Sequence, residues 1–342
     1  MTGVQTCALP IYDESKQIIT LERNDKWWGA APKLETVTLH VLDDSALGQA
    51  FANKEIDVLD YIFSADVYQQ ASGRDDAEVR QNTGLQWRHI MFNASSGPLA
   101  DKAVRQAIVR ATNREAIATS DLAGLPVDAK KTLMGNRFFL PVQEGYVDNS
   151  ADWSFDVEAA KKLLDGAGWV AGSDGVRTKD GERLELVMTI PTNAPVATNE
   201  ANLLQKQLGE VGIAITVSTV EIDKYFPEYI NKKNYAMTAF TTENTQYPLS
   251  TVGHYYASTS QSNYTGQSVP EVDEHVTKIG STPDGAERNK LANELDKILW
   301  ENVFNIPIYQ RMQLTAVPKT LRNFGAQGLA SFRPENIGYV KS

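Results

Sequence analysis

The strand–helix–strand order between residues 183 and 217 constrains the fold of this 342-residue chain more than any other feature. Residues 183–190, RLELVMTI, have the apolar content of a strand. Residues 198–211 have the spacing of an amphipathic helix that Gly212 would end, and residues 213–217, IAITV, indicate a second strand. A helix that connects two such strands is typical of a βαβ unit, in which the strands run parallel. The sequence therefore predicts an α/β fold.

Aspartates before two periodic segments predict the starts of further helices. Asp101 precedes a segment with apolar residues on one face, and Asp156 precedes VEAAKKLLDGAGW. A carboxylate just before a helix accepts hydrogen bonds from the free backbone N–H groups of the first turn. We therefore expect one helix from Asp101 to Ile117 and another after Asp156.

Residues 241–270 differ in composition from the segments on either side. They include TTENTQYPLS and YYASTSQSNYTGQSVP and are rich in Tyr, Ser, Thr and Asn. A long loop in a compact domain is commonly functional, and these side chains suit contacts with a polar ligand. An ordinary surface loop is the alternative interpretation.

Composition and charge disfavour several classes of partner. The formal net charge of -10 and the scattered Lys and Arg residues argue against nucleic acid. Cys7 is the only cysteine of the sequence, so the chain can form neither an internal disulfide nor a thiolate metal cluster. No apolar run approaches the roughly 18 to 20 residues that a membrane span needs.

Sequence motifs that would indicate catalysis or a cofactor are absent. The histidines are far apart and none belongs to an HExxH pair, and the sequence has no Walker loop, GxSxG elbow or GxGxxG spacing. We therefore expect no catalytic residue, no metal and no cofactor. A hydrolase acting on peptide or glycan stays open as an alternative, with Glu55, Asp57 and Glu243 as its candidate acids.

The opening segment, MTGVQTCALPI, fits no targeting signal. A secretory signal needs a basic start, an apolar stretch of about 7 to 15 residues and a cleavage site with small residues. Here the first basic residue is Lys16, and the longest apolar run is Ala8 to Ile11. We expect residues 1–11 to be foreign to the protein.

An ordered set of segments is distributed over nearly the whole length from Gln17 to the end. They are ITLERNDKWWG (19–29), ANKEIDVLD (52–60), MFNASSGPLADKAVRQAIVRATNREAI (91–117), FDVEAAKKLLDGAGW (155–169), LLQKQLGEVGIAITV (203–217), SNYTG (262–266) and NIPIYQRMQLTAVPKTLRNF (305–324). In this order and spacing they resemble the extracytoplasmic solute-binding proteins of ABC importers, family 5, the peptide/nickel/opine class.

The resemblance implies an α/β, two-lobe periplasmic-binding-protein fold, type II-like, that closes around a ligand. Residues 12–92 would form an incomplete lobe I, residues 93–302 lobe II, and residues 303–342 a return to lobe I. In this family the segment matching LERNDKWWG lies well inside the chain. The sequence therefore resembles a C-terminal portion of a longer protein, with lobe I incomplete at its N-terminus.

The resemblance also implies a function without catalysis. The protein would be the substrate-binding component of an ABC importer, capturing a peptide or peptide-like solute and delivering it to the permease subunits. We expect a monomer outside the cytoplasm, in the periplasm or lipid-anchored at the outer face of the cell membrane. A ligand-sensing receptor domain is a further alternative.

Peptide-binding relatives commonly carry a tryptophan, an aspartate three residues later and then an Asp-Pro; the first aspartate pairs with the ligand's amino group. Aligned on Pro248, this sequence has Thr241 and Asn244 at the first two positions, so the amino anchor is not matched. Glu243, one residue away, would point to the opposite face of an extended strand. By position, the expected ligand contacts are Thr241, Thr242, Glu243, Asn244 and Tyr247, with Tyr255 and Tyr264 from the following segment.

Overall fold

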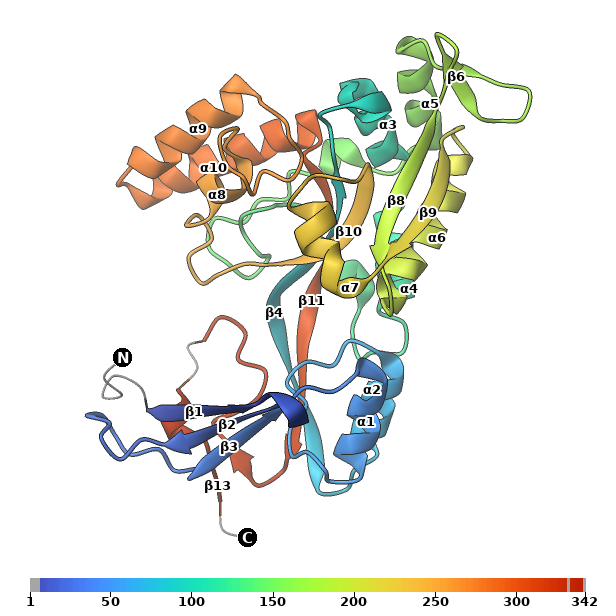
Figure 1. The fold of residues 1–342 in the computed structure, drawn as a ribbon. Coiled ribbons are helices and arrows are strands. Elements are labelled where there is room, and N and C mark those ends of the chain that lie inside the picture. The colour runs from blue at the N-terminus through green and yellow to red at the C-terminus, as the bar shows by residue number, and fades with distance from the viewer. Residues whose placement is uncertain (1–6, 331–332, 341–342) are drawn as a thin grey trace. The chain divides into compact units, whose positions relative to one another are not determined.

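The computed structural model describes residues 7–330 and 333–340, and the chain divides into two compact units. Unit 1 comprises the described residues of Met1–Gly84, Gly124–Val127 and Met312–Ser342, and unit 2 comprises Leu85–Ala123 and Asp128–Arg311 (Figure 1). The chain passes between the units inside two long strands, β4 (Ala77–Phe92) and β11 (Asn305–Pro318), and also on either side of Gly124–Val127.

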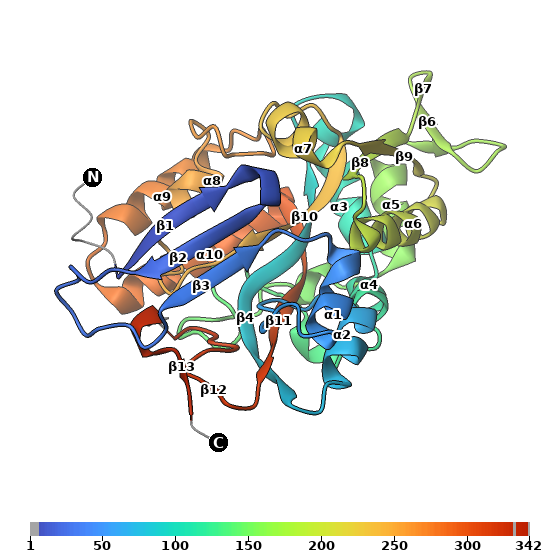
Figure 2. The same ribbon diagram turned by 60° about the horizontal axis from the view of Figure 1, so that its bottom comes forward.

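Unit 1 contains an antiparallel sheet and two helices. The sheet has the order β1-β2-β3, and Figure 2 shows these strands side by side. The elements are β1 (Ala8–Asp13), β2 (Ile18–Arg23), β3 (Thr36–His40), α1 (Asp44–Ala52), α2 (Ala65–Ser72) and the short pair β12 (Leu321–Arg322) and β13 (Gly338–Tyr339). Phe51, Ile62 and Leu314 are buried together in the core of this unit.

Part of the segment that is expected to be foreign lies in strand β1. Residues 8–11 pair with β2, where Ile11 lies opposite Thr20. Residues 1–6 lie outside the described residues. Backbone pairing does not report where a sequence comes from, so the foreign origin of residues 1–11 stays a prediction.

The boundaries between the compact units differ from the predicted lobe boundaries. The sequence predicts lobe boundaries after residues 92 and 302. The corresponding unit boundaries lie after Gly84 and Arg311, inside β4 and β11. The end of β4 belongs to unit 2 because it pairs with β10 (Met237–Glu243). Residues 124–127 also belong to unit 1, which no feature of the sequence predicts.

Unit 2 is built on a five-stranded sheet with the order β11-β4-β10-β8-β9. β8 (Glu185–Pro191) and β9 (Ala214–Val220) run parallel, and α6 (Pro195–Gly209) connects them and packs against both. The predicted βαβ unit is therefore confirmed. The helix begins before the predicted residue 198 because proline is well accommodated in the first turn of a helix.

The expectation of one helix over Asp101–Ile117 is wrong. This segment holds α3 (Lys102–Ala111) and the start of α4 (Arg114–Asp121). Asn113 lies between them, and its side chain accepts a hydrogen bond from Ala116 N at 2.9 Å. An asparagine that caps the second helix favours a new start over continuation of the first.

The remaining α-helices and strands of unit 2 range from two-residue strands to an 18-residue helix. They are α5 (Val157–Gly166), β5 (Val170–Ala171), β6 (Arg177–Lys179), β7 (Glu182–Arg183), α7 (Ile222–Lys224), α8 (Val252–Tyr256), α9 (Pro270–Ser281) and α10 (Gly285–Asn302). The region 241–270 is thus not one loop, because it begins in β10 and contains α8. Within the described part of the chain, no helix has both the length and the apolar character to cross a membrane.

Candidate ligand-binding site

A cavity of about 190 Å³ lies in unit 2 at the end of β10. Lining residues from β4, β10 and the turn after β10 are Trp87, His89, Met91, Phe240, Thr241, Thr242, Glu243, Asn244 and Pro248. Those from other segments of unit 2 are Arg137, Phe138, Phe226, Thr251, Tyr255, Tyr256, Ser262, Tyr264, Thr265, Phe304 and Asn305. The lining thus combines aromatic rings with hydroxyl and amide groups.

The pairing of β4 with β10 places an aromatic face on the cavity side of the sheet. His89 lies opposite Phe240 and Trp87 lies opposite Thr242 in the antiparallel register. Alternate residues of a strand share one face, so these four side chains lie on the same side. The His89 ring centroid is 4.8 Å from that of Trp87 and 4.4 Å from that of Phe240.

His89 is an uncharged group in this aromatic face. Its side chain is almost fully buried, and its Nε2 lies 2.8 Å from Thr242 Oγ1. Burial, together with the positive charges of Arg88 and Arg137, lowers the pKa of His89 to about 3. The imidazole is therefore neutral at physiological pH and adds no positive charge to the cavity.

The other face of the same strands carries a buried ion pair. Arg88 donates from Nε to Glu200 Oε1 of α6 at 2.9 Å, and the exposed fractions of the two side chains are 7% and 1%. Arg88 Nη1 also donates to Thr241 Oγ1 at 3.3 Å. The ion pair thereby holds the hydroxyl of a residue that lines the cavity.

Asn244 ties the end of β10 to two other cavity segments. Its Oδ1 accepts a hydrogen bond from Trp87 Nε1 at 3.0 Å, and its Nδ2 donates to Phe138 O at 2.9 Å. Its backbone N–H donates to Leu85 O at 2.9 Å. Both polar atoms of the side chain therefore have fixed protein partners.

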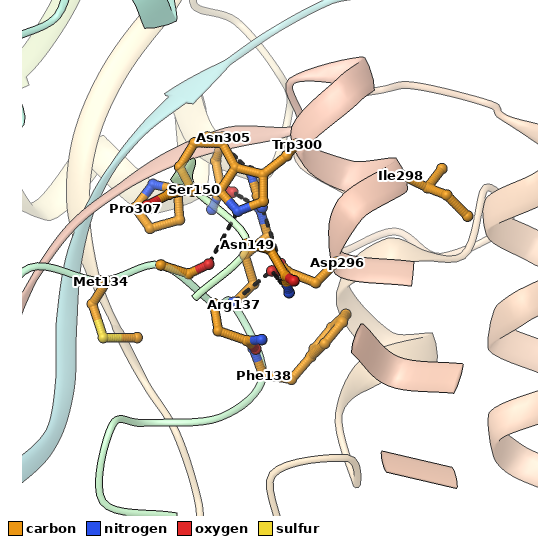
Figure 3. Close-up of polar contacts among 12 residues, drawn as sticks. Met134, Arg137, Phe138, Asn149, Ser150, Asp296, Ile298, Trp300, Asn305 and Pro307 are labelled. Atoms are coloured by element: carbon orange, nitrogen blue, oxygen red, sulfur yellow. Dashed lines mark hydrogen bonds and ion pairs between the residues drawn. The ribbon is translucent and has the colours of Figure 1, made fainter. Parts of the chain in front are cut away.

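Arg137 forms part of the cavity wall and forms a buried ion pair with Asp296. Figure 3 shows its contacts with Asp296 and Asn305 beside Trp300. Arg137 Nη1 lies 3.0 Å from Asp296 Oδ1, and neither side chain is exposed. The guanidinium also donates to Asn305 Oδ1 at 2.6 Å and lies 4.4 Å from the centroid of Trp300. The charge of Arg137 is therefore compensated within the protein.

Glu243 gives the cavity its one charged side chain that forms no ion pair among the described residues. It is exposed at the end of β10. Glu243 and Asn244 both line the cavity, although strand alternation predicted opposite directions for them. The alternation does not extend past Glu243 because β10 ends there. The cavity therefore presents a negative charge.

Most of the ligand contacts expected from the sequence lie together at this cavity. Thr241, Thr242, Glu243, Asn244, Tyr255 and Tyr264 line it. Tyr247 does not line it, and its side chain is 74% exposed.

Sequence reasoning missed the contribution of β4, above all Trp87 and His89. The stretch QWRHIMF carried a usable signal, because Trp87, His89 and Met91 occupy alternate positions and would share one face of a strand. It also missed Arg137, which no motif marks.

A family profile described as bacterial extracellular solute-binding proteins, family 5 Middle, matches residues 11–266. The oligopeptide-binding protein OppA of Mycobacterium tuberculosis is 32% identical over 330 residues, which cover 96% of this chain and 55% of that protein. The dipeptide-binding protein of Escherichia coli is 23% identical, covering 92% of this chain and 57% of that protein. The chain thus spans about half the length of these curated relatives.

Solved structures share the fold. The periplasmic EDTA-binding protein EppA superposes with a TM-score of 0.87 at 22% identity, covering 98% of this chain and 64% of that one. The oligopeptide-binding protein AppA from Bacillus subtilis, in complex with a nonapeptide, superposes with a TM-score of 0.83 at 21% identity, covering 98% and 66%. The predicted α/β, two-lobe periplasmic-binding-protein fold is confirmed. Because the family profile spans most of the sequence, the chain belongs to the bacterial extracellular solute-binding proteins, family 5.

Proposed function

We propose that this chain is the ligand-capturing part of the substrate-binding component of an ABC importer, and that its solute is a peptide or a peptide-like molecule. The observation that carries the proposal is the cavity at the end of β10 in a member of this family. The relatives named oligopeptide- and dipeptide-binding proteins favour peptides over other solutes.

The chemistry of the cavity supports a solute with both apolar and polar parts. Partly exposed aromatic rings such as Phe226, Tyr255 and Tyr264 offer flat contact area, and hydroxyl groups such as that of Thr242 can bond to backbone amides of a peptide. The charge of Glu243 favours a ligand with a positively charged group, for which a free amino terminus qualifies.

A hydrolase is the competing function, because His89 and Thr242 lie at the distance of a base and a nucleophile. A base is most effective when its pKa lies near the working pH, whereas the pKa of His89 is lowered to about 3. This imidazole is therefore a weak acceptor for the proton of Thr242. We propose binding without catalysis, as the names of the relatives also indicate.

The remaining assignments follow from the family. We propose that the protein acts outside the cytoplasm, in the periplasm or lipid-anchored at the outer face of the membrane, as a monomer that delivers solute to permease subunits. In this proposal unit 1 corresponds to lobe I and unit 2 to lobe II. A receptor domain that senses the same solute would use the same cavity.

A thermal-shift screen tests the proposal, since a ligand that binds only the folded state raises the melting temperature. The purified protein is screened against pools of peptides, amino acids, sugars and metal chelates, and bound ligand is identified by mass spectrometry. We expect a saturable shift with peptides and recovery of unchanged peptide. A shift with sugars or chelates alone would refute the peptide assignment, and cleaved peptide would refute binding without catalysis.

A further inference from the structure

We infer that Asn244 is a positioning residue, which fixes the Trp87 indole in the cavity wall, rather than a direct ligand contact. The sequence placed Asn244 among the ligand contacts because of its position in the chain. The inference rests on the proposed function only in the experiment that measures peptide binding.

The side chain of Asn244 is oriented by the protein itself. Its oxygen accepts from Trp87 Nε1 at 3.0 Å, and its nitrogen donates to Phe138 O at 2.9 Å. These bonds also determine which side of the amide carries the oxygen, because an indole only donates and a carbonyl only accepts. Turning the amide toward a ligand would break both bonds.

The partners of Asn244 are themselves parts of the cavity wall. Trp87 is 2% exposed, and its ring packs in a tilted arrangement against His89, with 4.8 Å between the ring centroids. A buried indole N–H needs an acceptor, and Asn244 supplies it. Phe138 packs edge-on against Tyr256 at 5.3 Å. One amide therefore links β4 to the segment that carries Phe138, and both segments line the cavity.

Substitutions of Asn244 and Trp87 distinguish the effects of the two hydrogen bonds that the Asn244 side chain forms. Asn244→Ala removes both, so Trp87 loses its acceptor and Phe138 O loses its donor. Asn244→Asp keeps an acceptor for Trp87, but a carboxylate has no N–H for Phe138 O. Trp87→Phe removes the indole donor while it keeps an aromatic ring. If Asn244 acts through Trp87, the effects of these changes are coupled.

A double-mutant cycle with a pool of tetrapeptides as the probe measures this coupling. We expect Trp87→Phe to weaken affinity about fivefold to tenfold, the effect of one lost hydrogen bond, and Asn244→Ala, which loses two, to weaken it by at least as much. The double variant should then bind no more weakly than the weaker single variant. If the two fold-changes multiply instead, Asn244 contacts the ligand independently of Trp87, and the inference is overturned.

The indole N–H signals of the ligand-free protein give a second readout by ¹H–¹⁵N NMR. The Trp87 signal is identified as the one that Trp87→Phe removes. We expect Asn244→Ala to shift this signal and speed its exchange with solvent, and Asn244→Asp to retain slow exchange. Tyr247→Ala, an exposed neighbour outside the cavity, should leave the signal unchanged.

This readout keeps the inference distinct from the proposed function. If the wild-type protein binds no tetrapeptide, the peptide proposal fails while the indole signal still tests Asn244. An unchanged Trp87 signal in Asn244→Ala would overturn the positioning role whatever the protein binds.

Discussion

Arg137 and Asp296 form an ion pair in which neither side chain is exposed, with 3.0 Å between Arg137 Nη1 and Asp296 Oδ1. The carboxylate also accepts a hydrogen bond from Asn149 Nδ2 at 2.9 Å. Burial raises the pKa of Asp296, while Arg137 and Asn149 act against this rise. The pair therefore holds Arg137 in the cavity wall, and removing either charge would lower the free energy of unfolding.

Asp296→Asn should lower the free energy of unfolding by about 3 to 5 kcal/mol, because it leaves the Arg137 charge buried without a counter-ion. Urea denaturation at neutral pH measures the loss. The exposed pair Glu158 and Lys161 serves as a control, since Glu158→Gln should change the same quantity by less than about 1 kcal/mol. Equal losses in both variants would contradict this account of the wall.

Asp121 should make stability depend on pH. Its Oδ1 accepts from Asn199 at 2.7 Å, and burial followed by the nearby Glu200 carboxylate raises its pKa from 3.8 to about 7. Between these values the folded state holds a proton that the unfolded chain releases. Its contribution to stability is therefore fully present below about pH 4 and is lost as pH rises through about 7.

Asp121→Asn, which cannot titrate, isolates this contribution. The free energy of unfolding of the wild type minus that of Asp121→Asn should decrease as pH rises from about 4 to about 8. The charged neighbours Glu200 and Arg88 are present in both proteins, so the difference isolates the effect of replacing Asp121. A difference that stays constant with pH would show that Asp121 does not bind this proton.

The contribution of His89 to stability should change with pH in the opposite direction to that of Asp121. Its folded pKa of about 3 lies below the ordinary value of 6.5, so the stability that the neutral ring contributes is present above about pH 6.5 and is lost as pH falls toward 3. The His89 ring signals in NMR, assigned with His89→Gln, should not shift between about pH 8 and about pH 5. A titration midpoint near 6.5 would contradict the burial of this ring.

Tyr264 and Tyr247 should differ in their effect on binding, although the sequence offered both as contacts. Tyr264 lines the cavity and packs edge-on against Phe240 at 6.1 Å, whereas Tyr247 lies outside it. With tetrapeptides as the probe, Tyr264→Ala should weaken affinity about tenfold through the lost aromatic contact, and Tyr247→Ala should leave it unchanged. Calorimetry measures both; a larger loss in Tyr247→Ala would place the ligand elsewhere.

Local signals account for the parts of the fold that were predictable. Asp156 accepts from Ala159 N at 2.9 Å and begins α5 as expected, because a cap and an apolar stripe lie within a few residues of each other. The same reasoning failed at Asn113, since an asparagine inside a periodic segment can face solvent or cap a new helix. Only the structure distinguishes these outcomes.

The site was harder to predict because it depends on pairing over long sequence distances. Trp87 meets Asn244 only through the register between β4 and β10. Arg137 lines the cavity while Asp296, far along the chain, compensates its charge. The polar composition after residue 240 indicated a segment that contributes to the cavity lining, but no local pattern shows which side chains are already hydrogen-bonded within the protein.

The claim that this cavity holds the solute is tested most directly by photo-crosslinking with a tetrapeptide that carries benzoylphenylalanine, followed by mapping of the attachment sites. The account predicts attachment in β4 near Trp87, in β10 and within residues 251–265, and its loss when excess unlabelled peptide competes. Attachment at another cavity of unit 2, lined by Trp169 and Lys179, or attachment that competitor does not suppress, would contradict the claim.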